Sequence, residues 1–336
     1  MSDRDPLIET FIEGTDWKGA TVAPLAGDAS NRRYLRLIHP ENGSAVLMDA
    51  PRDKGEDTAP FIRIAEYLTA QGLSAPRILA RDEALGFLLL EDLGDDLFAR
   101  VIPRDPNLEY SLYSAATDLL VQLHAAPPPE GLAAYDPALM ADLAALPFDW
   151  YAKAEPGLRR DFAQAMQSTL EGLHGARDVL IQRDYHAENL LWLPGRRGTA
   201  RVGLLDFQDA MVGHRAYDLV SLLQDARRDV PVAIEEAMVI RYTDQSGLDP
   251  VRFRADYNRL GAQRNLRIVG VFARLCIRDG KAHYVDLIPR VWDHLMRNLE
   301  DPALADVATL VKQGLPTPDA DFLERLKGRC ATHPTP

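Results

Sequence analysis

The sequence predicts an α+β protein of two lobes: a small N-terminal lobe with an antiparallel sheet and a helix, and a larger, mainly helical C-terminal lobe. Two observations support this prediction. Runs or alternation of apolar residues typical of strands occur at residues 21–25, 34–37, 45–51, 74–80 and 86–90. Nearly all periodic segments after residue 100 instead have helical spacing. We expect one lobe at residues 1–93 and the other at 94–336.

Composition excludes several classes of protein. The 336 residues suffice for two cores. The 50 acidic residues outnumber the 38 Lys and Arg, and the net charge of -12 argues against general binding to nucleic acid or anionic membranes. Cys276 and Cys330 are far apart, which fits a reducing compartment. No apolar run is long enough to span a bilayer. We therefore expect a cytoplasmic protein with no nucleic-acid or membrane partner and no evident obligate protein partner.

The elements of the N-terminal lobe follow from local patterns. Residues 6–13 alternate apolar and acidic positions and predict a first helix. Residues 26–31 are rich in Gly, Asp, Ser and Asn, and the alternation that follows predicts a β-hairpin. Residues 61–71 have helical spacing, with Gly72 suited to end the helix. The strand pattern breaks at residues 91–97, where we expect a hinge.

The C-terminal lobe combines helices with one hairpin. Helical spacing predicts helices at residues 107–125, 140–151, 161–174, 232–243, 250–280 and 284–299. The apolar runs Leu190–Leu193 and Val202–Leu205 flank the turn Pro194–Gly198, which predicts an antiparallel hairpin. Asp218 stands where a helix should start, so its carboxylate would hold the backbone of a preceding loop.

Polar residues flank this hairpin at a spacing typical of phosphotransfer. Protein kinases carry H-R-D-x-x-x-x-N and, after a hairpin, D-F-G. Here Asp184 precedes Asn189 by the same interval, and Asp206 precedes a Phe. Gln182 replaces the His, and Gln208 replaces the Gly. Solvated turn carboxylates are the alternative, but the order and spacing together favour phosphotransfer.

This motif assigns a role to each polar residue. We expect Asp184 to orient or deprotonate the attacking hydroxyl. Asn189 and Asp206 would hold Mg²⁺ on the phosphates of ATP, because carboxylate and amide oxygens suit that ion. ATP and Mg²⁺ are therefore the expected cofactors.

The N-terminal lobe would bind the nucleotide. Small residues let backbone N–H groups approach phosphate, and polar side chains add donors. An ordinary hairpin turn is the alternative for this segment. The backbone of the hinge, at Glu91 to Leu93, would pair with the adenine. The expected nucleotide-binding residues are Asp28, Ala29, Ser30, Asn31, Arg32, Arg33, Glu91 and Leu93.

The third strand lacks an expected cation. In protein kinases this strand ends with a Lys that holds the phosphates. Met48 takes its place here, so another cation is needed. Arg32 and Arg33 are nearest in sequence, and the alternative is that both are merely solvated.

Further motifs along the chain are Gly27–Ser30, Val46–Pro51, Asp206–Ala210, Tyr217–Leu223, Gln263–Leu266 and Phe272–Leu275. With them, the chain is similar over nearly its whole length to the aminoglycoside phosphotransferase and choline kinase superfamily, which implies a bilobal, protein-kinase-like fold. Within it, the chain most resembles the bacterial anomeric kinases of N-acetylmuramate and N-acetylglucosamine. That resemblance implies a sugar 1-phosphate made from ATP in peptidoglycan recycling, and a subgroup without the strand Lys.

The substrate is expected to be a small amino sugar. Only residues 209–217 separate the Asp206 motif from the next helix, too few to dock a peptide. His186 and Asp209 lie near the motif and would bind sugar hydroxyls. Because Arg pairs bidentately with carboxylate, Arg267, Arg274 and Arg278 would bind the lactyl carboxylate of N-acetylmuramate. A solvated basic face is an equal alternative for these three.

Two other functions stay open. The first alternative is a kinase of another small alcohol, such as an aminoglycoside, choline or homoserine. The second is a nucleotide-binding regulator without catalysis. Choline sites use aromatic cages, and the 7% aromatic content argues against one. A regulator has no need of Asp184, Asn189 and Asp206 together.

Overall fold

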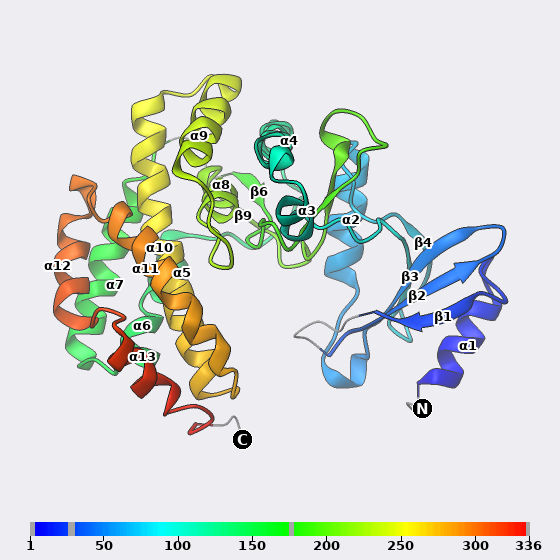
Figure 1. Cartoon of the computed structure of the whole chain (residues 1–336), viewed down its shortest axis with the longest axis horizontal. Helices are drawn as coiled ribbons and strands as arrows, with labels where there is room; N and C mark the ends of the chain where they lie inside the picture. Colours follow the sequence, from blue (N-terminus) through cyan, green and yellow to red (C-terminus); the bar gives the residue numbers. More distant parts are fainter. Residues whose placement is uncertain (1–3, 26–30, 175–177, 334–336) are drawn as a thin grey trace. The chain divides into compact units, whose positions relative to one another are not determined.

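The computed structural model describes residues 4–25, 31–174 and 178–333. The chain divides into two compact units, Met1–Leu119 with Ala187–Ala210 and Leu120–His186 with Met211–Pro336. The first contains a five-stranded antiparallel sheet and the second is mainly helical (Figure 1). The predicted α+β class is therefore confirmed.

The sheet of the first unit is built from the predicted strands. In spatial order it consists of β1 (Thr21–Pro24), β2 (Arg33–His39), β3 (Gly43–Asp49), β5 (Phe87–Glu91) and β4 (Ile78–Asp82). Every neighbouring pair is antiparallel. In β2 and β3, Leu35 lies opposite Leu47 and Leu37 opposite Ala45, so the alternating apolar residues share one face.

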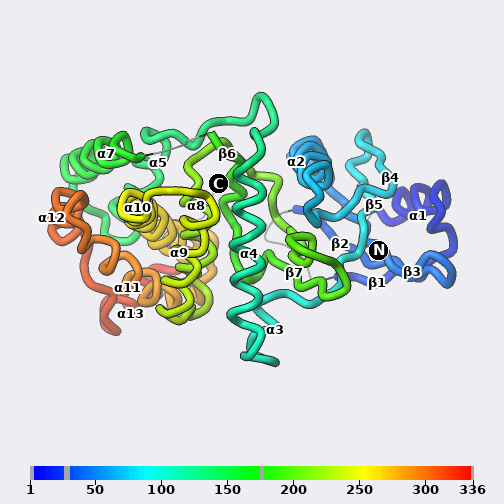
Figure 2. The backbone as a smooth tube through the Cα atoms, turned by 90° about the horizontal axis from the view of Figure 1, so that it is seen from above, coloured from blue at the N-terminus to red at the C-terminus, as the bar shows by residue number. Residues whose placement is uncertain are grey.

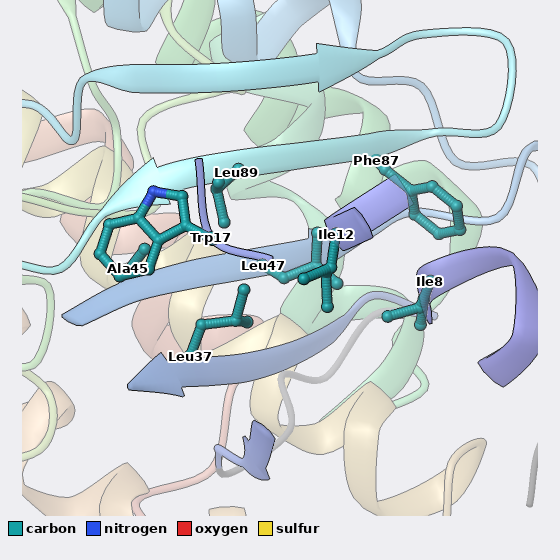
Figure 3. Packing of buried hydrophobic residues seen from close by; sticks show 8 residues of the cluster. All are labelled: Ile8, Ile12, Trp17, Leu37, Ala45, Leu47, Phe87 and Leu89. Carbon is teal, nitrogen blue, oxygen red and sulfur yellow. The ribbon is translucent and has the colours of Figure 1, made fainter. Parts of the chain in front are cut away.

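Helix α1 (Asp5–Glu13) covers that face. Ile8 and Ile12, one helical turn apart, pack with Leu47 and Phe87 of the sheet (Figure 3). Trp17, just beyond the helix, completes the cluster. This core fixes the register of the sheet, because a slip of one residue would turn its apolar side chains to the other face.

The opposite face carries Val46 and Met48, which alternate with Leu47 along β3. Met48, which the sequence assigns to the position of the kinase lysine, is completely buried. Helix α2 (Ala59–Ala70) contacts β4, and its Phe61 packs against Phe207 with ring centroids 4.9 Å apart.

The predicted hairpin is present in the first unit. Strand β7 (Leu190–Trp192) pairs antiparallel with β8 (Val202–Leu204). The N–H of Leu205 donates to the carbonyl of Asn189 at 3.0 Å, so the pairing continues past the strands. Two helices, α3 (Phe98–Arg104) and α4 (Glu109–Leu123), follow β5 in the chain.

Helix α10 (Pro250–Ile277) is the centre of the second unit. It contacts the helices around it, and Figures 1 and 2 both show it beside α11. Gly270 allows α6 to approach closely, because a Cβ there would collide with Leu146. The other helices are α5 (Pro137–Ala144), α6 (Leu146–Trp150), α7 (Pro156–Glu171), α8 (Ala216–Leu223), α9 (Val232–Ser246), α11 (Ile288–Asn298), α12 (Ala305–Gly314) and α13 (Ala320–Lys327).

The second unit also contains a short strand pair beside the turn of Asp184. Strand β6 (Val179–Ile181) pairs antiparallel with β9 (Met211–Gly213). The turn that contains Asp184 begins directly after β6, and α8 begins three residues after β9. Over residues 4–25, 31–174 and 178–333, no helix is both long and apolar enough to cross a membrane.

Candidate active site

The first unit contains a cavity of about 420 Å³. Val46 and Leu90 provide an apolar part of its lining, Glu91 is the last residue of β5, and Leu93 lies two residues beyond that strand. Asn189 and Asp206 also line it. The structure thus brings the predicted hinge residues and the predicted metal ligands to one cavity. Its volume is in the range of small-ligand sites.

Asn189 and Asp206 meet at the open end of the β7–β8 hairpin. The Asn189 Nδ2 donates to Asp206 Oδ2 at 3.4 Å, and Gln208 Nε2 donates to Asp206 Oδ1 at 2.7 Å. Asp206 has a φ of 56°, in the left-handed region that costs a non-glycine residue energy. In this backbone conformation its carboxylate contacts both Asn189 and Gln208.

The donor set fits a cation that also binds phosphate. Within the part of the chain that the structure describes, no group of three or more His, Cys, Asp or Glu residues is arranged to hold a metal. Mg²⁺ needs no such cage, because one or two carboxylates together with substrate phosphates and waters suffice. Asp206 offers the carboxylate and Asn189 the amide oxygen.

The turn before β2 is described only in part. Asp28, Ala29 and Ser30 lie outside the described residues. The backbone N–H of Asn31 donates to Glu56 at 3.1 Å, and Arg32 forms an ion pair with the same carboxylate at 2.8 Å.

Arg33 also has carboxylate partners. It pairs with Asp5 at 2.8 Å and with Asp49 at 3.2 Å. Among the described residues, those that line the cavity include Arg36 but neither Arg32 nor Arg33. The source of positive charge for the phosphates therefore stays a prediction.

In the second unit, α8 holds the backbone of the turn after β6. Asp218 is fully buried, and its carboxylate accepts hydrogen bonds from the N–H groups of Gln182 at 2.6 Å and Arg183 at 2.9 Å. Burial raises the pKa of Asp218 to about 7, although both donors favour the ionised form. The predicted role of Asp218 as an anchor is confirmed.

Two further side chains stabilise this turn. Ser221 Oγ donates to the carbonyl of Arg183 at 3.3 Å and accepts from Arg264 Nη2 at 2.7 Å. Arg183 has a φ of 72°, so the turn adopts a conformation that these contacts must maintain. The next residue is Asp184, whose position is set by this framework.

Asp184 is ionised at neutral pH. Burial alone would raise its pKa, but the positive charges of Arg267 and Arg264 outweigh that effect and hold the pKa below its ordinary value. A carboxylate in this state can accept a proton or orient a hydroxyl.

His186 lies two residues beyond Asp184 and is buried. Burial, together with the charges of Arg227 and Arg264, lowers its pKa to about 4 against the opposing effect of Asp225. The imidazole is therefore neutral, and its Nε2 lies 3.4 Å from Arg227 Nη1. Asp209, the other residue expected to bind hydroxyls, is exposed and belongs to the first unit.

The three arginines of α10 differ in their surroundings. Arg267 interacts electrostatically with Asp184, and its Nη1 donates to Tyr217 Oη at 3.5 Å. Arg274 is half-buried, and burial lowers its pKa. Arg278 forms an ion pair with the adjacent Asp279 at 2.6 Å. Arg267 is thus the best placed of the three.

Sequence reasoning missed several residues of this region, namely Asp225, Arg227 and Arg264. The polar run at 225–229 directly follows a helix, and its charge density was the available signal. Arg264 lies in the Gln263–Leu266 motif, but the helical spacing of Arg267, Arg274 and Arg278 predicted a binding role for a different face of the same helix.

Comparison with known proteins identifies the family. The profile of the phosphotransferase enzyme family (APH) matches residues 21–254. The chain belongs to this family. A Caulobacter vibrioides phosphotransferase named N-acetylmuramate/N-acetylglucosamine kinase is 41% identical over 350 aligned positions, which cover 91% of this chain and 95% of the relative.

Solved structures of other phosphotransferases share the fold. Choline kinase LicA from Streptococcus pneumoniae matches with a TM-score of 0.60 at 18% identity, covering 88% of this chain and all of that chain (100%). Amicoumacin kinase hAmiN, in complex with AMP-PNP, Ca²⁺ and Ami, matches with a TM-score of 0.59 at 14% identity, covering 98% and 94%. The predicted superfamily and kinase-like fold are confirmed.

Proposed function

We propose that this phosphotransferase is a sugar 1-kinase, which transfers phosphate from ATP to the anomeric hydroxyl of N-acetylmuramate and N-acetylglucosamine. The observation that carries the proposal is the 41% identity to the Caulobacter vibrioides enzyme of that name across nearly the whole of both chains. Peptidoglycan recycling in the cytoplasm is the expected setting. We further propose that the two functional lobes are residues 1–93, which bind the nucleotide, and residues 94–336, which contain the catalytic, metal and substrate sites.

The proposed cofactors are ATP and Mg²⁺. The hinge segment at Glu91–Leu93 would bind the base, since both residues line the cavity of the first unit. Asp206 and Asn189 would hold the metal, which supplies positive charge to the phosphates. The related amicoumacin kinase structure contains AMP-PNP and Ca²⁺ and supports a nucleotide with a divalent cation.

The chemistry proposed for Asp184 follows from its charge. The ionised carboxylate accepts the proton of the anomeric hydroxyl as the hydroxyl oxygen bonds to the terminal phosphorus of ATP. The bond between that phosphorus and the bridging oxygen breaks, and ADP leaves. Asp218 and Ser221 keep the backbone of Gln182 and Arg183 in place during this step.

The acceptor contacts are proposed from proximity in sequence and charge. His186 and Asp209 would bind sugar hydroxyls. Arg267, supported by Arg274 and Arg278, would bind the lactyl carboxylate, and its interaction with Asp184 supports this placement. We expect Arg267→Ala to raise the KM for N-acetylmuramate about ten- to a hundredfold more than that for N-acetylglucosamine. Equal effects on both sugars would assign Arg267 to structure instead.

The decisive experiment is a parallel acceptor panel. ADP release is measured with N-acetylmuramate, N-acetylglucosamine, choline and an aminoglycoside, and the position of the phosphate is determined by phosphorus NMR. We expect turnover with both amino sugars and a signal of an anomeric phosphate. Turnover with choline or the aminoglycoside alone, or phosphate at another hydroxyl, would contradict the proposal.

A further inference from the structure

The segment Asp225–Asp229, between α8 and α9, begins at a buried polar network. Gln224, which ends α8, accepts hydrogen bonds at Oε1 from Asn265 at 2.8 Å and from Asn298 at 2.9 Å. Its Nε2 donates to Glu235 at 3.0 Å. Because an unpaired buried amide is costly, this network gives Gln224 one preferred position.

The far side of the segment is held by α11. Arg290 donates to both carboxylate oxygens of Asp229 and, at 3.3 Å, to the carbonyl of Ala226. Within the segment, Asp225 is 1% exposed, and its Oδ1 accepts from the N–H of Arg227 at 2.8 Å. Asp225 therefore holds the backbone N–H of Arg227, within a segment that is itself held at Gln224, Ala226 and Asp229.

The side chain of Arg227 reaches the turn that bears Asp184. Its Nη1 lies 3.4 Å from His186 Nε2. Because His186 is neutral, its Nε2 can accept this hydrogen bond when the ring proton is on Nδ1. Arg227 itself is partly exposed, so the guanidinium is anchored by a buried group without being enclosed.

We propose that Arg227 binds the oxygen atoms of the acceptor sugar beside its reacting hydroxyl, and that Asp225 is the residue that positions it. This inference rests on the proposed function of Asp184 in a sugar kinase. A guanidinium offers several donors in a fixed plane, which suits the closely spaced oxygens of a polyhydroxylated ring. The site next to the reacting hydroxyl is common to both amino sugars, so Arg227 recognises them equally, unlike Arg267.

The chain offers a matched set of variants for Arg227. Steady-state kinetics of Arg227→Gln should show an acceptor KM raised about ten- to a hundredfold for both sugars, the range for hydrogen bonds from a charged donor. The KM for ATP should change by less than about twofold, as for distant sites. Arg227→Lys should recover part of the loss. Arg254→Gln is the control, since Arg254 is a partly exposed arginine paired with Glu236 elsewhere in the same unit.

A second comparison tests the role of Asp225. Asn at this position keeps the oxygen that accepts from the Arg227 N–H, whereas Ala removes it. We expect Asp225→Asn to keep a near-normal acceptor KM and Asp225→Ala to raise it. If Asp225 acts through Arg227, the double variant Asp225→Ala, Arg227→Gln should be no worse than Arg227→Gln alone.

Three results would overturn the inference. These are an unchanged acceptor KM in Arg227→Gln, a change confined to ATP KM or kcat, and additive losses in the double variant. The kinetics use whichever alcohol the wild-type enzyme phosphorylates in the panel. The amino-sugar assignment can therefore fail while Arg227→Gln still raises the KM of the true acceptor, so the two failures are distinguishable.

Discussion

Removal of the Asp218 carboxylate tests whether α8 holds the catalytic turn. Asp218→Ala leaves the buried N–H groups of Gln182 and Arg183 without their acceptor. An unsatisfied buried donor costs about 1–3 kcal/mol, so two of them cost roughly 2–6 kcal/mol. That loss is large against a total stability of about 5–15 kcal/mol. Urea denaturation should show it as a lower free energy of unfolding, together with reduced kcat.

The pH dependence of stability provides an independent measurement. The pKa of Asp218 is raised to about 7, above its unfolded value, so its contribution is present at acid pH and lost as the pH rises through about 7. Three pKa units correspond to roughly 4 kcal/mol. Asp218→Asn cannot titrate, and the difference between wild type and this variant should therefore vary between pH 4 and pH 8.

Two results would refute this reasoning. One is an Asp218→Ala protein whose free energy of unfolding and kcat both match the wild type. The other is a pH-independent difference between wild type and Asp218→Asn, which would mean that burial does not raise the pKa. Ser221→Ala is a useful reference, because it removes the weaker contact at 3.3 Å to the same turn, together with the hydrogen bond from Arg264, and leaves the Asp218 carboxylate in place.

The remaining predictions concern the phosphate and the base. Asp184→Asn should retain nucleotide binding but lower kcat about a hundredfold or more, and wild-type turnover would exclude it as the base. Asp206→Ala should abolish turnover that depends on Mg²⁺, and a variant that responds to Mg²⁺ titration as the wild type does would count against Asp206 as a metal ligand. Arg32→Ala or Arg33→Ala should weaken ATP binding more than Arg36→Ala, and equally small effects would leave the charge to Mg²⁺ and backbone.

Local signals were sufficient to predict the sheet and the hairpin. The alternation in β2 and β3 and the turn chemistry between β7 and β8 each depend on neighbouring residues, and both pairings are present. The meeting of Asn189 and Asp206 followed from the hairpin alone. Helix α10 was also predictable, because its periodicity extends over 28 residues.

Short elements were not predictable, because they are too short to contain such a local signal. Strands β6 and β9 have three residues each, too few to show a period, and they are defined only by pairing across the chain. The expected single helix at residues 140–151 is two helices, because α5 ends at Ala144 and α6 begins at Leu146 with Pro147 in its first turn. Helices α12 and α13 beyond residue 299 were missed.

The functional residues also differ in whether a local sequence pattern or tertiary packing identifies them. Asp184, Asn189 and Asp206 could be found because their spacing is a sequence pattern. Arg264 and Arg227 lie beside the Asp184 turn only because α10 and the segment after α8 are folded there. No periodicity within one helix contains that information, since it arises from packing between distant parts of the chain.

The contact between Phe61 and Phe207 connects α2 to the neighbouring Asp206. Any ligand that holds Asp206 still must also restrain the Phe207 ring beside it, and through that ring the first turn of α2. Nucleotide binding should therefore slow hydrogen–deuterium exchange of the backbone amides around Phe61. A smaller side chain at residue 61 would uncouple the two, so that α2 exchanges at the same rate with and without nucleotide.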